Sequence, residues 1–346
     1  MAKKSLIIIY HWFPHYRDFI FNEISKNFDL KLIGDKKSRY QNLKLMDLKS
    51  YNFKKVKNIW LGPFLYQLGL IKIIKENNDS NYIFLADWKF ISTWIILIFF
   101  KRNNLFFAWT HGISISDSFL IKNIKRIYYS FFDEILTYNE QASKTLNSLK
   151  INSRPIYNSL ENFNFLPVKS GEEKDWLFVG RIIKERLLCD FILSMSKEVI
   201  SNTIFHIIGP CDFKKELESL IEKNDLKNKI ILHGAIYDFN EIINISKSCK
   251  YFIHPSDVGL SALLAVNLNL ILYTHDDFNT HKPEIEAAIQ SKRIITFKKT
   301  DNINLQPLFS VNNININDNY NLKEVISKWS VINQINILNK LLYAKS

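Results

Sequence analysis

The chain has 346 residues, too many for one ordinary hydrophobic core and enough for two domains of roughly 150 residues each. With 47% hydrophobic and 14% aromatic residues, the composition excludes intrinsic disorder, because disordered chains lack the apolar side chains that offset the entropy of ordering. The net charge of +12 falls almost entirely on residues 1–150, which hold 23 Lys and Arg against 12 Asp and Glu. This asymmetry favours nucleic acid or a phospholipid surface as a partner of that half, and a merely soluble basic domain is the alternative.

The N-terminal apolar run Ser5–Tyr10 is followed by polar residues and proline with no small-residue cleavage site, so it predicts a buried strand and not a signal peptide. The longest apolar stretch, Phe90–Phe100, is far shorter than the roughly 20 residues of a membrane-spanning helix. For Trp94–Phe100 we expect core residues of a buried helix, with a place in a bilayer interface as the alternative. Three widely spaced cysteines without a CxxC pair exclude a disulfide framework and favour a reducing compartment. We therefore expect a cytoplasmic protein.

Short β-branched or aromatic runs alternate with helix-length amphipathic segments, a pattern typical of parallel sheets covered by crossover helices. In the first half we expect strands at Leu6–Tyr10, Leu30–Ile33, Tyr82–Ala86, Leu105–Trp109, Glu134–Thr137 and Pro155–Tyr157. We expect helices near Tyr16–Lys26, Lys89–Phe100 and Ile121–Phe132. Between Asn158 and Lys174 the periodicity lapses into polar, Pro and Gly residues, which predicts a linker.

A second alternating set follows the linker. We expect its strands at Trp176–Val179, Thr203–Ile208, Lys229–Leu232, Tyr251–His254 and Leu270–Tyr273. We expect its helices near Glu185–Val199, Phe213–Lys223, Phe239–Lys247 and Leu260–Val266. The pattern predicts two Rossmann-like α/β domains over residues 1–160 and 161–321, with a helix in 322–346 that braces the first domain.

Two doubly wound domains in series favour a nucleotide-type ligand in a cleft at the carboxyl ends of both sheets. The sequence contains neither GxGxxG nor GxxxxGK[ST], which disfavours a dinucleotide dehydrogenase and a P-loop nucleotidase. Gly180 allows a tight turn after a strand, and Arg181 and Arg186 flank the start of the next helix, where two guanidiniums would neutralise a diphosphate. An ordinary strand–helix turn with surface arginines is the alternative.

This stretch and the residues after it resemble the GT-B-fold retaining glycosyltransferases of family 4, in a variant seen in capsule and O-antigen biosynthesis. The resemblance runs in order through residues 175–290 and implies that Arg181 and Arg186 hold the donor diphosphate, although Arg186 replaces the family's usual Lys. Phe205–Pro210 resembles the family's strand and glycine turn, and His233–Asp238 resembles its base-contacting loop. The donor-binding residues implied are Gly180, Gly209, Gly234, Ala235, Ile236, Asp257, Val258, Gly259 and Leu260.

The family's two donor-loop glutamates are missing, because Ser256 and Leu264 stand in their places. Asp257 is next to the first of these positions and is expected to approach the sugar hydroxyls. Glu284, in a Pro-Glu-x-Glu stretch, is a candidate for a displaced catalytic carboxylate. The alternative for Glu284 is a solvated acidic residue in the first turn of a helix, where the helix dipole favours it.

In the first half, Trp109–Gly112 resembles the family segment whose histidine approaches the donor sugar, so His111 is a catalytic candidate. The opening loop resembles the family's acceptor-facing loop, which makes His15, Arg17 and Asp18 acceptor-facing candidates. No metal is expected, since this fold class generally works without one, although His275, Asp276 and Asp277 imitate metal ligands. The candidates for contact with phospholipid are Lys122, Lys125, Arg126, Tyr128 and Tyr129.

The resemblance implies transfer of a sugar from a nucleoside diphosphate sugar to a hydroxyl of a lipid-linked or growing bacterial surface glycan, with retention of configuration. It implies no cofactor besides this co-substrate, and a peripheral place on the inner face of the cell membrane through the basic N-terminal domain. A catalytically degenerate GT-B partner subunit or glycan-binding module is the alternative. Nucleic-acid binding is disfavoured, because no RNA- or DNA-binding module is recognisable.

Overall fold

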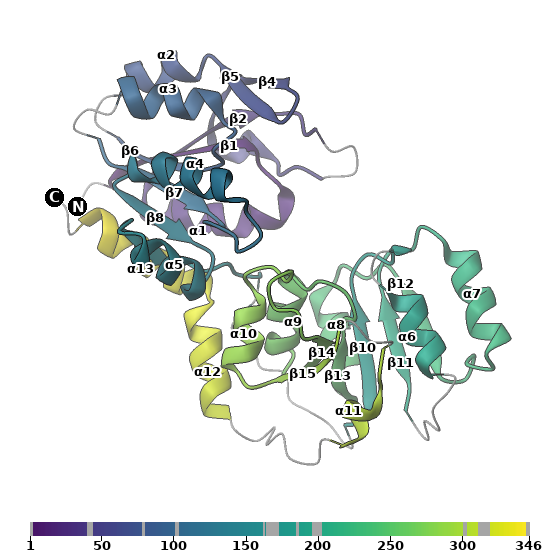
Figure 1. Cartoon of the computed structure of the whole chain (residues 1–346). Helices are drawn as coiled ribbons and strands as arrows, with labels where there is room; N and C mark the ends of the chain where they lie inside the picture. The colour runs from purple at the N-terminus through teal and green to yellow at the C-terminus, as the bar shows by residue number, and fades with distance from the viewer. Residues whose placement is uncertain are drawn as a thin grey trace. The chain divides into compact units, whose positions relative to one another are not determined.

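The computed structural model describes residues 3–39, 44–77, 80–100, 104–161, 163, 173–184, 187–195, 203–299, 303–310 and 319–343. It divides into two compact units, which are described separately (Figure 1). Unit 1 comprises Met1–Glu161 and Val331–Ser346, and unit 2 comprises Asn162–Ser330. Each unit is a parallel α/β sheet covered by helices, so the predicted fold class is confirmed.

Unit 1 contains a seven-stranded sheet in which every neighbouring pair is parallel. Its order is β3 (Asn52–Lys55), β2 (Asp29–Asp35), β1 (Ser5–Trp12), β6 (Asn81–Leu85), β7 (Phe106–Thr110), β8 (Glu134–Thr137) and β9 (Ser153–Pro155). The central strands are continuous apolar runs because both faces of the sheet are covered. An antiparallel hairpin of β4 (Lys57–Leu61) and β5 (Phe64–Leu68) was not predicted.

Helices cover the two faces of this sheet with two separate hydrophobic clusters. One cluster includes α1 (Asp18–Asn27) and α13 (Val331–Tyr343). The other includes α2 (Leu70–Glu76), α3 (Ile91–Phe99), α4 (Phe119–Ser130) and the end of α5 (Glu140–Ser148). Two short 3-10 helices, His15–Arg17 and Leu48–Ser50, complete the described elements of this unit.

Unit 2 contains a six-stranded parallel sheet. Its order is β12 (Ile230–Gly234), β11 (Phe205–Ile208), β10 (Asp175–Val179), β13 (Cys249–Ile253), β14 (Ile271–His275) and β15 (Ile294–Phe297). Its helices are α6 (Leu188–Met195), α7 (Lys214–Lys223), α8 (Phe239–Ser246), α9 (Leu260–Asn267), α10 (Ile285–Gln290), α11 (Gln306–Ser310) and α12 (Asn319–Lys328). The strand order reverses between β10 and β13, and ligands of such sheets bind at that point.

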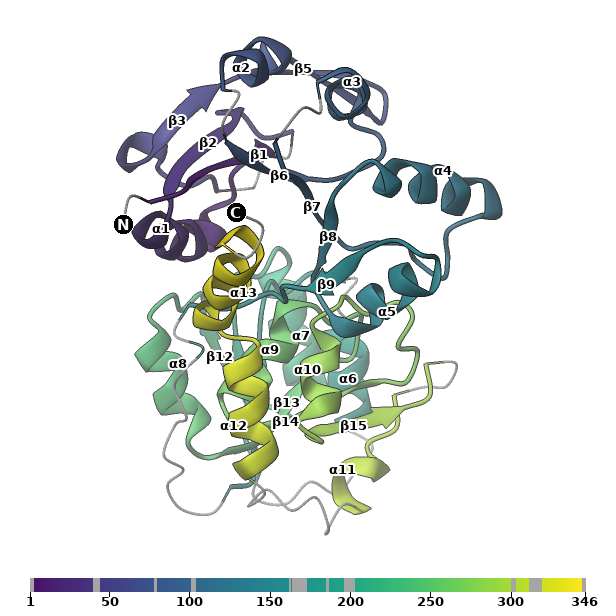
Figure 2. The same ribbon diagram turned by 90° about the vertical axis from the view of Figure 1, so that its left-hand side faces the viewer.

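The expected C-terminal helix is two helices, and only the second belongs to unit 1. α12 runs beside α9 and α10 in unit 2 (Figure 2). The break comes at Trp329, which is fully buried and donates a 3.3 Å hydrogen bond from its indole N–H to Gln290. α13 then contributes four core residues to unit 1, and the Gln334 amide donates to the Tyr157 carbonyl at 3.2 Å.

No helix among the described residues is long and apolar enough to cross a membrane.

Candidate functional site

Three glycines hold the carboxyl ends of β10, β11 and β12 close together. The Gly180 N–H donates to the Ile208 carbonyl at 3.0 Å, and the Gly209 N–H donates to the Gly234 carbonyl at 2.7 Å. A Cβ atom on Gly209 would lie 1.8 Å from the Gly180 carbonyl oxygen, far inside van der Waals contact. Only glycine therefore fits at position 209. The close approach of Gly209 to Gly180 fixes the turn that precedes Arg181.

Arg181 follows this turn at the end of β10, on one side of the point where the strand order reverses. Its side chain is exposed. The loop behind it is held by the Ile182 N–H, which donates to the Pro210 carbonyl at 2.8 Å. Arg186, its expected partner, lies outside the described residues, so the structure places one of the two predicted guanidiniums at the carboxyl edge of the sheet.

On the other side of the reversal, Gly259 precedes α9 without a side-chain cap. Within the described part of the chain, no protein group accepts from the N–H groups of Gly259 and Leu260. Unsatisfied N–H groups at a helix start favour an anion. Unit 2 thus brings an exposed guanidinium and a helix N-terminus to adjacent strand ends.

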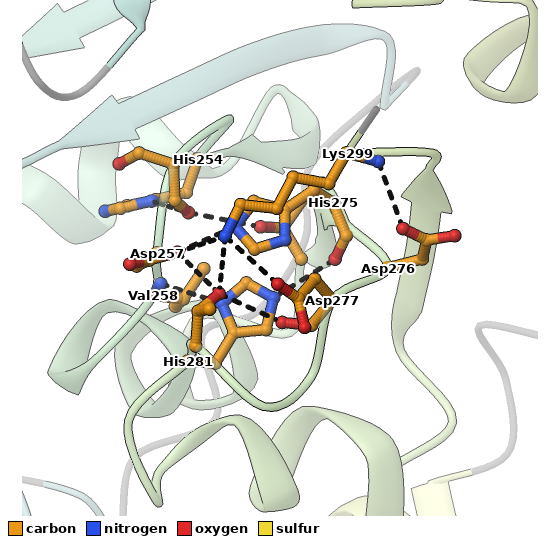
Figure 3. A network of polar contacts seen from close by, with 11 residues as sticks. His254, Asp257, Val258, His275, Asp276, Asp277, His281 and Lys299 are labelled. Atoms are coloured by element: carbon orange, nitrogen blue, oxygen red, sulfur yellow. Dashed lines mark hydrogen bonds and ion pairs between the residues drawn. The ribbon is translucent and has the colours of Figure 1, made fainter. Parts of the chain in front are cut away.

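Asp257, in the loop after β13, belongs to a polar network with the ends of β14 and β15 (Figure 3). One carboxylate oxygen of Asp257 accepts from Thr280 at 2.8 Å and lies 3.0 Å from the His275 ring nitrogen and 3.4 Å from the Lys299 ammonium. Burial alone would raise the pKa of Asp257, but the Thr280 hydrogen bond and the Lys299 charge hold this pKa below its usual range. Asp257 is therefore ionised at neutral pH.

His281 fixes the backbone of the same loop (Figure 3). The Val258 N–H donates to its Nδ1 at 2.9 Å, so Nε2 carries the proton and donates to the His275 carbonyl at 3.1 Å. The His275 and His281 rings stack with centroids 4.1 Å apart, and burial lowers the pKa of both. The loop that bears Asp257 is thereby held on both sides.

Asp257, His275 and His281 place one ligand atom each within 4.8 Å of one another, as a metal site requires. The groups present fit a metal poorly, because both nitrogens of His281 already have hydrogen-bond partners. The Lys299 ammonium, moreover, is bound between Asp257 and Asp277, 3.2 Å from the latter (Figure 3). The Lys299 ammonium therefore already supplies the positive charge that a metal ion would bring to this cluster.

Glu284 and Ser256, which bear on the missing donor-loop glutamates, are both buried. Glu284 is only 4% exposed, so the alternative of a solvated residue in a first helical turn is wrong. It immediately precedes the short helix α10, which packs against α9. The Ser256 hydroxyl is buried and has no hydrogen-bond partner among the described residues. The structure brings neither residue to an exposed position.

In unit 1, His111 follows β7 and is exposed, with its ring centroid 4.5 Å from that of Tyr138. His15 and Asp18 are also exposed, and the Asp18 carboxylate accepts from the Tyr51 hydroxyl at 2.7 Å. Arg17 differs from the expectation that it faces an acceptor. It is 7% exposed, because aromatic side chains from three strand regions enclose its guanidinium.

The predicted phospholipid contacts on α4 are partly wrong. Tyr128 and Tyr129 lie in the core, and Lys125 is ion-paired with Asp117 at 2.6 Å. The exposed face instead carries Arg126 together with large apolar side chains that the sequence analysis did not single out. These are Ile115 in the preceding loop and Phe119, Leu120 and Ile127 on the helix.

Residues 161–268 match the model of the family described as glycosyl transferases group 1. The structure resembles a glycosyltransferase from Rickettsia africae ESF-5 (TM-score 0.68, 15% identity, covering 99% of this chain and 98% of that chain). It also resembles the apo lipopolysaccharide outer core galactosyltransferase WaaB and Anabaena HepE in complex with UDP, each with TM-score 0.67, 12% identity and coverage of 99% and 100%. No curated protein sequence matches the chain.

Proposed function

We propose that this chain, a nucleotide-sugar glycosyltransferase by the group 1 domain of its second unit, transfers the sugar to a hydroxyl of a lipid-linked or growing bacterial surface glycan. We propose further that configuration at the anomeric carbon is retained, as in the capsule and O-antigen enzymes that the sequence resembles. The observation that supports the proposal is the exposed Arg181 and the uncapped start of α9 on either side of the strand-order reversal.

In this proposal the donor diphosphate lies against Arg181 and the N–H groups of Gly259 and Leu260. The bond from the anomeric carbon to the diphosphate breaks, and the acceptor oxygen bonds to the same face of that carbon. The departing diphosphate takes the acceptor proton, so no protein nucleophile is needed. The protein's part is to stabilise negative charge that grows on the diphosphate, and Arg186 is proposed to assist.

Asp257 is proposed to accept hydrogen bonds from hydroxyls of the donor sugar, in place of the missing glutamates. Its side chain is 51% exposed, and Lys299 and Thr280 keep it ionised and fixed. His111 of unit 1 is proposed as a catalytic residue, and His15 and Asp18 are proposed as acceptor-facing residues. Glu284, which is 4% exposed, stays the candidate for the displaced catalytic carboxylate.

The experiment that tests the proposal measures nucleoside diphosphate release from UDP-glucose, UDP-galactose and GDP-mannose. UDP sugars come first because the similar Anabaena HepE was solved with UDP-glucose. One donor is expected to release its diphosphate, and proton NMR of the first-formed product is expected to show the donor's own anomeric configuration. Inversion would contradict the retaining mechanism, and no release from any donor would favour the degenerate binding module.

Metal removal is expected to leave turnover unchanged. Dialysis against EDTA should alter donor turnover by less than about twofold, because Lys299 already supplies the cation beside Asp257. Turnover before and after dialysis, with and without added Mg²⁺ or Mn²⁺, measures this. Loss of activity that one of these ions restores would show that the Asp257 cluster binds a metal after all.

We also propose that unit 1 binds an anionic membrane surface through α4 and the loop before it. Phe119 is 83% exposed, and its apolar neighbours Ile115, Leu120 and Ile127 are exposed beside it. The Lys122 ammonium donates to the Ile115 carbonyl at 3.0 Å, and Arg126 is exposed on the same helix. Apolar side chains beside cations suit the interface of an anionic bilayer.

Replacing both Phe119 and Leu120 with serine is expected to lower partitioning onto phosphatidylglycerol-containing vesicles at least about tenfold, because each apolar side chain contributes to insertion. Co-sedimentation with the vesicles measures the partitioning. Leu61→Ser, at a 63% exposed apolar position in the β4–β5 hairpin, is the control and should bind as the wild type does. Equal loss in the control, or equal binding to pure phosphatidylcholine, would contradict the proposal.

A further inference from the structure

We infer that Arg17 is a positioning residue that holds His111 in place through the ring of Tyr138. The inference goes beyond the proposed function and rests on it only in assigning His111 a catalytic task. All the residues involved lie in unit 1, at the carboxyl ends of β1, β7 and β8.

The Arg17 guanidinium bridges strands that are not neighbours in the sheet. It donates to the Tyr10 hydroxyl of β1 at 2.8 Å and to the Tyr138 hydroxyl, directly after β8, at 2.9 Å. Its central carbon also lies 5.1 Å from the ring centroids of both Trp109 and Tyr138, as in cation–π contacts. The side chain thus fixes Tyr138 relative to β1 and β7.

Burying the Arg17 guanidinium costs free energy of folding. No described acidic side chain forms an ion pair with Arg17, and its two hydrogen-bond partners are phenols. Burial raises the pKa of Tyr10 well above its usual value, so this partner is neutral. Because a buried charge without an ion-pair partner loses its hydration, packing alone does not explain why an arginine stands here.

The exposed side chain of His111 contacts Tyr138, which Arg17 holds in place. The His111 and Tyr138 rings have centroids 4.5 Å apart and an interplanar angle of 40°. A group that acts on substrate must be held within a fraction of an ångström, and loops after strands hold such groups only when buried neighbours fix them. Tyr138 is such a neighbour, and Arg17 fixes its hydroxyl.

Two tyrosine variants test the inference as a matched pair. Tyr138→Phe and Tyr10→Phe each remove one hydroxyl partner of the same buried guanidinium, yet only Tyr138 contacts His111. We expect Tyr138→Phe to lower kcat about tenfold with little change in KM, and Tyr10→Phe to leave kcat within about twofold, at similar thermal stability. Equal kcat losses in the two variants would overturn the inference, because the cluster would then be merely structural.

A second measurement does not depend on activity. In protein labelled with 13C-histidine, the His111 resonance, assigned with His111→Gln, should move toward its unfolded position in Tyr138→Phe and in Arg17→Met, but not in Tyr10→Phe. Arg17→Met takes the donor away from the buried Tyr10 and Tyr138 hydroxyls, so it should lower the melting temperature as well as kcat. An unmoved His111 resonance in Arg17→Met would overturn the inference even if kcat fell. A wild type that transfers no sugar would contradict the proposed function and leave this resonance to decide the positioning role.

Discussion

Replacing Arg181 with alanine is expected to lower turnover at least about 100-fold, which corresponds to about 2.7 kcal/mol of transition-state stabilisation. Arg181 is the one described guanidinium that the fold places at the carboxyl end of β10, next to the strand-order reversal. Negative charge grows on the diphosphate as it leaves. Loss of the Arg181 guanidinium therefore destabilises the transition state more than it weakens donor binding. We therefore expect the loss chiefly in kcat, measured by nucleoside diphosphate release at saturating donor.

Lys184→Ala is the matched control for Arg181→Ala. Lys184 is an exposed cation three residues further along the same loop, so its removal changes the local net charge equally. It should lower turnover by less than about threefold. Near-normal turnover in a folded Arg181→Ala variant, or an equal loss in Lys184→Ala, would contradict the role of Arg181.

Replacing Gly209 with alanine is expected to lower the free energy of unfolding of unit 2 by about 3 kcal/mol and to abolish nucleotide binding. The added Cβ would lie 1.8 Å from the Gly180 carbonyl oxygen and 2.8 Å from its carbon, and both are backbone atoms. The turn that carries Arg181 must therefore move. Denaturant unfolding followed by tryptophan fluorescence measures the first effect, since Trp176 lies in the core of unit 2.

Gly62→Ala is the control for this substitution. Gly62 also has a positive φ of 58°, but a Cβ there would meet nothing within 4 Å. Only backbone strain should result, about 1 kcal/mol, with nucleotide binding unchanged. If Gly209→Ala were no more destabilising than Gly62→Ala, the close approach of the two glycine turns would not hold in solution.

The sequence predicted well the strands that are long apolar runs buried on both faces. β1 contains the expected Leu6–Tyr10, and β10 begins within one residue of its expected start. The hairpin around Gly62 was missed, although the turn dipeptide Gly62-Pro63 between two apolar runs gave a usable signal. β15 was missed because its four residues follow the charged pair Lys292 and Arg293 and form too short a run.

The missed strand explains the main omission from the candidate site. Lys299 follows β15, and a lysine just after a strand of this sheet would have been singled out had the strand been recognised. Thr280 gave no such signal, because its contact with Asp257 joins residues 23 positions apart. Composition alone could not have found either contact.

The errors on α4 arose because the sequence did not show which face of this helix is buried. The error on Arg17 arose because side chains distant in the sequence enclose it. The basic and aromatic residues of α4 looked alike in the sequence, yet one turn of the helix buries Tyr128 and Tyr129 and exposes Ile127. Lys125 is neutralised by Asp117, eight residues away. Arg17 was expected to face the acceptor because its loop resembles the family's acceptor-facing loop, and its burial depends on aromatic residues up to 121 positions away.

Thermal unfolding with UDP, GDP, CMP and ADP, on wild type and Arg181→Ala in parallel, tests the central claim most directly, because ligand binding to the folded state raises the melting temperature. We expect one nucleoside diphosphate, with UDP first in order, to stabilise the wild type and to have little effect on Arg181→Ala. Lack of stabilisation by every nucleotide, or equal stabilisation of both proteins, would contradict a donor site at the carboxyl end of β10.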